Sequence, residues 1–123
     1  MIKLPYGLAD FHDLITEGYV YVDRTAHIRY VEDFGRNLVF IRPRRFGKSL
    51  WLNTLGCYYD LALAGERDRL FGRLAIGRDP TPLANRYFVL AWDFSLVDAR
   101  GSVDEITARL WEHCNVRIES FLT

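Results

Sequence analysis

The fold is decided at Leu38-Val39-Phe40-Ile41-Arg42-Pro43-Arg44-Arg45-Phe46-Gly47-Lys48-Ser49-Leu50. The stretch opens with four apolar residues in a row, a pattern typical of a strand that is buried on both faces in a parallel sheet. A basic turn and a Gly-Lys-Ser sequence follow. From Lys48 onward, apolar residues cover most of a helical wheel, which predicts a buried helix that ends at Gly65. The stretch therefore predicts a strand, a tight turn and a helix in immediate succession.

A turn between a strand and a helix is suited to binding phosphate. Its backbone N–H groups wrap around the anion, and the N-terminal end of the helix points at the same charge. Gly47 would let the backbone approach closely, Lys48 would reach the outer phosphates, and the Ser49 hydroxyl would bind Mg²⁺. These three residues are therefore the first candidates for a nucleotide site.

Three arginines distinguish this turn from the usual phosphate-binding loop. That loop has a second glycine five residues before the Gly-Lys pair, and Arg42 holds that position here. Pro43 then fixes a backbone angle and removes one N–H donor. The guanidinium groups of Arg42, Arg44 and Arg45 can replace the missing donors, because guanidinium binds phosphate in a bidentate manner. Two other interpretations stay open: a solvated surface turn, and a site for a nucleic-acid backbone.

The composition is that of one globular domain of 123 residues, of which 50% are hydrophobic and 15% aromatic. Sixteen basic residues balance sixteen acidic ones, so any nucleic-acid or membrane surface must be a local patch. No apolar run reaches the ~18 residues that cross a bilayer, and no signal peptide is visible. We expect a soluble, cytoplasmic protein in which Cys57 and Cys114 are free thiols and not metal ligands.

The rest of the chain alternates predicted strands with predicted helices. Strands are expected at 19–22 and 87–92, and helices at 11–15, 25–34 and 67–74. A capping box, Ser102-Val103-Asp104-Glu105, begins a long amphipathic helix that runs to Phe121. The order strand, loop, helix, strand, helix is that of an α/β fold with parallel strands. We therefore predict a parallel sheet flanked by helices.

Asp93 stands at the end of the predicted strand 87–92. A carboxylate at such a place can hold the Mg²⁺ shell that ATP hydrolysis requires, beside a group that orients the attacking water. The other interpretation is a turn-forming aspartate at a strand end. The chain has no Asp-Glu pair at this position, which favours the second interpretation.

Four motifs carry a family resemblance across most of the chain: Leu4-Pro5-Tyr6-Gly7, Asp10-Phe11, Tyr21-Val22-Asp23-Arg24-Thr25 and the Arg42 to Leu50 stretch. In this order they resemble the N-terminal region of the AAA-ATPase-like family of bacterial and archaeal proteins. Larger members of that family continue into a PD-(D/E)XK nuclease-like domain. The resemblance implies a P-loop NTPase fold that binds ATP at Gly47, Lys48 and Ser49. It also makes Arg42 a feature of the family, whereas Arg24 replaces the family's lysine.

The family also has a later apolar strand that ends in a sequence like Ile-Asp-Glu-Tyr-Asp and supplies carboxylates for the metal. This chain stops before such a strand. The resemblance therefore implies that residues 1–123 are the N-terminal part of an AAA-ATPase-like P-loop domain, in which Asp93 belongs to an earlier strand. It further implies ATP hydrolysis in the full-length protein and weak or no hydrolysis by this part.

We expect the ATP-binding portion of an AAA-like ATPase, with ATP and Mg²⁺ as its ligands. The candidate cofactor-binding residues are Arg42, Arg44, Arg45, Phe46, Gly47, Lys48, Ser49 and Leu50. Lys48 is the candidate catalytic residue, because its charge would neutralise the β- and γ-phosphates, and Ser49 is the candidate metal ligand. Two alternatives stay open. One is a non-catalytic basic module that binds nucleic acid or a protein partner, and the other is a truncated product without independent function.

Overall fold

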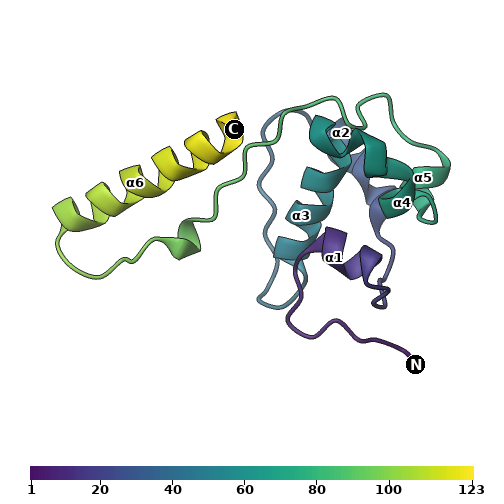
Figure 1. Ribbon diagram of the computed structural model, residues 1–123, viewed down its shortest axis with the longest axis horizontal. Helices are drawn as coiled ribbons and strands as arrows, with labels where there is room; N and C mark the ends of the chain where they lie inside the picture. The colour runs from purple at the N-terminus through teal and green to yellow at the C-terminus, as the bar shows by residue number, and fades with distance from the viewer. The chain divides into compact units, whose positions relative to one another are not determined.

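The computed structural model describes residues 1–123 and divides into two units, Met1–Phe88 and Val89–Thr123. Helices are its regular structure (Figure 1). The first unit contains α1 (Phe11–Thr16), the 3-10 helix η1 (Thr25–His27), α2 (Ile28–Asp33), α3 (Lys48–Tyr59), the 3-10 helix η2 (Leu61–Glu66), α4 (Arg67–Phe71) and α5 (Ala75–Arg78). The second unit contains the 3-10 helix η3 (Phe94–Leu96) and α6 (Val103–Leu122).

The predicted parallel sheet is absent, so that prediction is wrong. The β contacts are two isolated parallel bridges, Lys3–Tyr19 and Asp60–Tyr87. The apolar run at 38–41 forms no ladder, and its Val39 is 86% exposed. The run at 88–92 forms no ladder either. A strand is stable only where a neighbouring strand completes its backbone hydrogen bonds, and an apolar run does not by itself supply that neighbour.

Two helices begin where local signals in the sequence predict. The Asp10 side chain accepts a hydrogen bond from the Asp13 N–H at 3.0 Å and caps α1. At the start of α6, the Ser102 hydroxyl accepts from the Glu105 N–H at 3.3 Å. The Glu105 carboxylate accepts in return from the Ser102 N–H at 2.7 Å. The predicted capping box is therefore confirmed.

Helix ends differ more from the prediction than helix starts. α3 begins at Lys48 but ends at Tyr59 and not at Gly65. The reason is Asp60, which leaves the helix and whose carboxylate accepts a hydrogen bond from the Ala62 N–H at 3.0 Å to cap η2. The predicted helix 25–34 divides into η1 and α2, and α4 ends at Phe71.

The core of the first unit is built around aromatic rings. Phe11 stacks on Phe71 with ring centroids 4.9 Å apart, and Tyr58 meets Phe71 edge-on at 5.4 Å. The buried cluster joins side chains from α1 to α5 and the loop after α5, and it consists of Phe11, Ile28, Cys57, Tyr58, Leu70, Phe71, Ile76 and Ala84. The second half of α3 is thus anchored in the core, whereas Lys48 and Ser49 at its start are exposed.

Polar contacts hold α3 at its second turn and at its C-terminal end. The Asn53 side chain accepts a hydrogen bond from the Phe11 N–H at 2.6 Å, which joins the start of α1 to α3. The Tyr59 hydroxyl donates to the Glu32 carboxylate of α2 at 2.9 Å. The same Glu32 oxygen accepts from the Thr81 hydroxyl at 2.7 Å. These contacts fix the direction of the helix that follows the candidate phosphate loop.

The second unit consists of a turn and one long helix. The Phe94 ring lies 6.3 Å from the His113 ring of α6, measured between centroids. Arg109 of α6 donates to the carbonyl oxygens of Asp98, at 3.0 Å, and Arg100, at 2.5 Å. No side chain of α6 is fully buried. None of the helices in the structure combines the length and the apolarity that crossing a membrane requires.

Both cysteines are free, as the sequence predicts. Cys57 is buried on α3, and Cys114 is half-buried on α6. Burial raises the pKa of the Cys57 thiol to about 11, so the thiol stays protonated at neutral pH. The structure contains no group of three or more His, Cys, Asp or Glu side chains that could hold a metal ion.

Candidate phosphate-binding loop

The candidate loop connects α2 to α3 (Figure 1). Residues 37–43 lie outside regular secondary structure, a turn follows at Arg44 and Arg45, and α3 begins at Lys48. Arg45 and Gly47 both have left-handed backbones, with φ of 64° and 76°. A β-carbon at Gly47 would meet no protein atom within 4 Å, so within the protein itself it is the backbone angle that favours glycine here. A left-handed residue followed by a helical one points successive N–H groups the same way, which is a geometry that binds anions.

The N-terminus of α3 is not neutralised by the protein. Gly47 is its N-cap, so no side chain caps the helix, and the first turn contains no acidic residue. The N–H groups of Lys48, Ser49 and Leu50 have no partner within the helix, and the helix dipole places partial positive charge on them. α1 and α6 differ, because Asp10 and the Ser102 capping box satisfy their first N–H groups. α3 is therefore the long helix whose N-terminus is free to bind an external anion.

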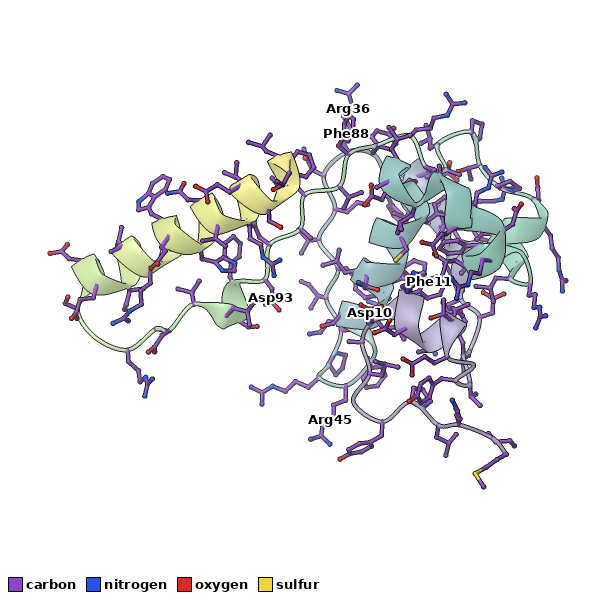
Figure 2. The ribbon with its side chains drawn as sticks, viewed as in Figure 1. Asp10, Phe11, Arg36, Arg45, Phe88 and Asp93 are labelled. Carbon is purple, nitrogen blue, oxygen red and sulfur yellow. The ribbon has the colours of Figure 1, made fainter.

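The side chains of the loop add positive charge without a counter-ion. The Arg42 guanidinium lies over the Phe40 ring, 4.9 Å from its centroid. Arg44, Arg45 and Lys48 are exposed and form no hydrogen bond or ion pair through their side chains. Figure 2 shows Arg45 projecting from the end of the loop into solvent. The backbone N–H groups and these cations can therefore bind one anion together.

The predicted nucleotide-binding residues all lie on this single segment, from Arg42 to Leu50. Seven of the eight are exposed, and Phe46 is among them at 67%. Leu50 is half-buried and packs against the core. Its side chain therefore anchors the segment to the core.

Asp93 has the geometry of a turn residue. Its carboxylate accepts hydrogen bonds from the Ser95 N–H at 3.0 Å and the Ser95 hydroxyl at 2.5 Å, which caps η3. These two hydrogen bonds lower the pKa of Asp93 below its usual value. The residue belongs to the second unit, whereas the loop belongs to the first. The capping contacts with Ser95 favour the turn-forming interpretation of Asp93 over the metal-holding one.

Asn53 positions the helix behind the loop and is not among the residues predicted from the sequence. The residue lies in the second turn of α3, and its hydrogen bond to the Phe11 N–H joins two helices that are far apart in the sequence. One signal was available: Asn53 is a polar side chain within a largely apolar helix. That signal indicates a buried polar contact, although it does not identify the partner.

Comparison with known proteins adds two matches. Residues 5–123 match the family described as "AAA-ATPase_like: Predicted AAA-ATPase". The chain is also similar to the "Uncharacterized protein in vnfD 5'region" of Azotobacter chroococcum mcd 1, with 47% identity over 55 residues. The matched region covers 43% of this chain and 10% of that relative, so the match spans a small part of the relative's length. No solved structure matches the chain.

Proposed function

The chain belongs to the predicted AAA-ATPase family, and we propose that it binds ATP with the loop from Arg42 to Leu50. The observation that carries the proposal is the uncapped N-terminus of α3, where a left-handed glycine leads directly into Lys48 and Ser49. Backbone N–H groups and the helix dipole attract phosphate at such a terminus. The family match supports a nucleotide as the source of that phosphate.

Each residue of the Gly-Lys-Ser sequence has its own task in this proposal. Gly47 turns the backbone so that the N–H groups of the first helical turn face the phosphates. Lys48, which has no counter-ion in the protein, neutralises the β- and γ-phosphates. The Ser49 hydroxyl is a ligand of Mg²⁺, whose other ligands are phosphate oxygens and water. Arg44 and Arg45 donate charge-assisted hydrogen bonds to the remaining phosphate oxygens.

Hydrolysis of the bound ATP belongs, in this proposal, to a longer protein. It needs a carboxylate in the Mg²⁺ shell and a group that orients the attacking water. The loop supplies no such carboxylate, since the segment from Arg42 to Leu50 contains no acidic residue. We expect residues 1–123 to bind ATP, to hydrolyse it slowly or not at all, and to work in the cytoplasm.

Isothermal titration calorimetry with Mg²⁺-ATP tests the proposal. We expect saturable binding at one site, and we expect Lys48→Ala to weaken it about tenfold to a hundredfold, because a charge-assisted contact is lost. Arg86→Ala is the matched control, since it also removes one cation. Arg86 follows Asn85, which contacts the Asp60 carbonyl oxygen just beyond the C-terminal end of α3, about 18 Å from Lys48 along the helix. Absence of saturable binding, or equal effects of the two variants, contradicts the proposal.

A further inference from the structure

Three Phe-x-cation triplets recur at six-residue spacing between α2 and the start of α3. They are Phe34-Gly35-Arg36, Phe40-Ile41-Arg42 and Phe46-Gly47-Lys48. The third triplet lies within the loop proposed to bind ATP. The first triplet precedes this loop and the second ends at its first residue. The proposed ATP binding does not involve the aromatic rings of either. We call residues 34–48 the Phe-cation segment.

The three rings of the Phe-cation segment are exposed to solvent. Phe34, Phe40 and Phe46 are 78%, 50% and 67% exposed. Phenylalanine is among the residues most often buried, and single exposed apolar side chains need no explanation. Three exposed rings at regular spacing on one segment are different, because they offer repeated stacking surfaces to one extended ligand.

The charge of the Phe-cation segment has one sign. Between Asp33 and Asp60 the chain has no acidic residue, and its cations there are Arg36, Arg42, Arg44, Arg45 and Lys48. None of these five forms an ion pair. The whole chain has zero formal net charge, so this cluster is a local excess. A ligand with several regularly spaced negative charges complements it.

The triplet Phe40-Ile41-Arg42 shows how a ring and a cation combine. The Arg42 guanidinium lies 4.9 Å from the centroid of the Phe40 ring, and half of Phe40 stays exposed. A flat ligand that stacks on this pair has a cation within reach of any negative group attached to it. Six residues span at most ~20 Å, so successive triplets are separated by the length of a few nucleotides. Figure 2 shows Arg36 and Arg45 at opposite ends of the segment.

We propose that the Phe-cation segment binds single-stranded nucleic acid. Unpaired bases stack on Phe34, Phe40 and Phe46, and Arg36 and Arg42 bind the phosphates between them. Arg44, Arg45 and Lys48 add phosphate contacts while the loop holds no ATP. A duplex fits less well, because its bases stack on one another and are not free to stack on protein rings. An acidic protein segment would pair with the cations but would give the three rings nothing to stack on. The inference goes beyond ATP binding and does not depend on it.

Fluorescence anisotropy with a labelled oligothymidylate of about 16 nucleotides tests the inference, with an oligouridylate of equal length as the RNA arm. Phe34→Leu and Phe40→Leu keep an apolar side chain but remove the ring. We expect each to weaken binding at least about fivefold, the lower end of what the loss of one stacked base costs. Trp111→Leu is the matched control, because it removes a ring that is 64% exposed on α6. We expect it to bind as the wild type does.

Salt dependence separates phosphate contacts from other attraction. From about 50 mM to about 200 mM salt, the logarithm of the binding constant should fall against the logarithm of salt with a slope of about −0.7 per phosphate contact. Arg36→Gln should reduce the size of that slope by about 0.7. A slope that does not change in this variant contradicts the proposed contact.

Competition distinguishes the other ligands. The inference is overturned if polyglutamate or a duplex displaces the oligonucleotide as effectively as an unlabelled single strand does. It is also overturned if the Phe variants bind like the wild type. Phe34 and Arg36 lie outside the ATP loop, so their variants should bind Mg²⁺-ATP normally. Failure of the wild type to bind ATP while it binds single strands overturns the proposed function and leaves this inference standing.

Discussion

Asp23 is the residue on which three segments of the first unit converge. One of its oxygens accepts hydrogen bonds from the Thr25 N–H at 2.9 Å and the Thr25 hydroxyl at 2.6 Å, and the other accepts from the Ala75 N–H at 2.7 Å. Thr25 in turn accepts a hydrogen bond from the Ile76 N–H at 3.2 Å. Burial alone would raise the pKa of Asp23, but the hydrogen bonds from Thr25 and Ala75 outweigh burial and lower it. The carboxylate therefore ties η1 to the start of α5.

Asp23→Asn should lower the free energy of unfolding by ~1–2 kcal/mol at about pH 7, because an amide cannot accept all three hydrogen bonds. The folded pKa of Asp23 is lower than the unfolded one, so its contribution is present above the unfolded pKa of about 3.9 and is lost as pH falls through the folded pKa. Urea unfolding should show the gap between wild type and variant closing at acid pH. Asp33→Asn, at an exposed residue without a hydrogen bond or ion pair, is the control. A gap that persists unchanged at acid pH contradicts this account.

Gly47 tests a second single-residue claim, the need for a left-handed backbone. Gly47→Ala should destabilise the protein by roughly 1–2 kcal/mol, because an L-residue pays that amount at φ of 76° even though its β-carbon meets no atom. Gly65→Ala is the matched control, since its β-carbon also meets nothing and its φ is not positive. Thermal unfolding should separate the two variants. Equal melting temperatures would remove the argument that the loop requires glycine at this position.

At the scale of the elements, helix starts could be predicted and strands could not. Asp10, Gly47 and the Ser102 capping box mark the starts of α1, α3 and α6, because a cap depends on residues within one turn. The end of α3 involves a distant residue in addition to the local cap that Asp60 provides. Tyr87 accepts a hydrogen bond from the Leu61 N–H at 2.8 Å and donates one to the Tyr59 carbonyl oxygen at 3.0 Å. Local patterns cannot reveal such a partner, and the same limit explains why the apolar run 38–41 has the pattern of a strand without forming one.

The start of α6 supplies the test at this scale. Ser102→Ala should weaken the helix by ~1 kcal/mol, because it removes the side-chain acceptor of the Glu105 N–H. Hydrogen exchange of the amides in the first turn of α6 should then be faster by about fivefold. Ser120→Ala, near the other end of the same helix, is the control and should leave those amides unchanged. Equal exchange in the two variants would mean that the capping box does not hold the helix start.

At the scale of the whole molecule, the core lies in the first unit, and the residues proposed to bind ligands belong to that unit but lie outside its core. Phe71 is fully buried between Phe11 and Tyr58, whereas the residues of the Phe-cation segment are exposed. The composition predicts a chain with a core, and the family resemblance identifies the loop. Neither predicts which apolar residues stay exposed, because the runs at 38–41 and 88–92 have the same apolar character as buried segments.

Phe71→Ala should lower the free energy of unfolding by ~3–5 kcal/mol, because it leaves a cavity among aromatic rings. Leu52→Ala removes an apolar side chain that is exposed on α3 and should change stability by less than ~0.5 kcal/mol. Urea unfolding of both variants measures the difference. Similar losses from the two substitutions would contradict the position of the core.

The central claim is that the N-terminus of α3 binds the phosphates of ATP. It is tested most directly by titrating isotope-labelled protein with Mg²⁺-ATP and recording the backbone amide resonances. The account predicts saturable shifts that are largest at Gly47, Lys48 and Ser49, and unchanged resonances in α6. Saturable shifts centred elsewhere, or no shifts at millimolar ATP, would contradict it.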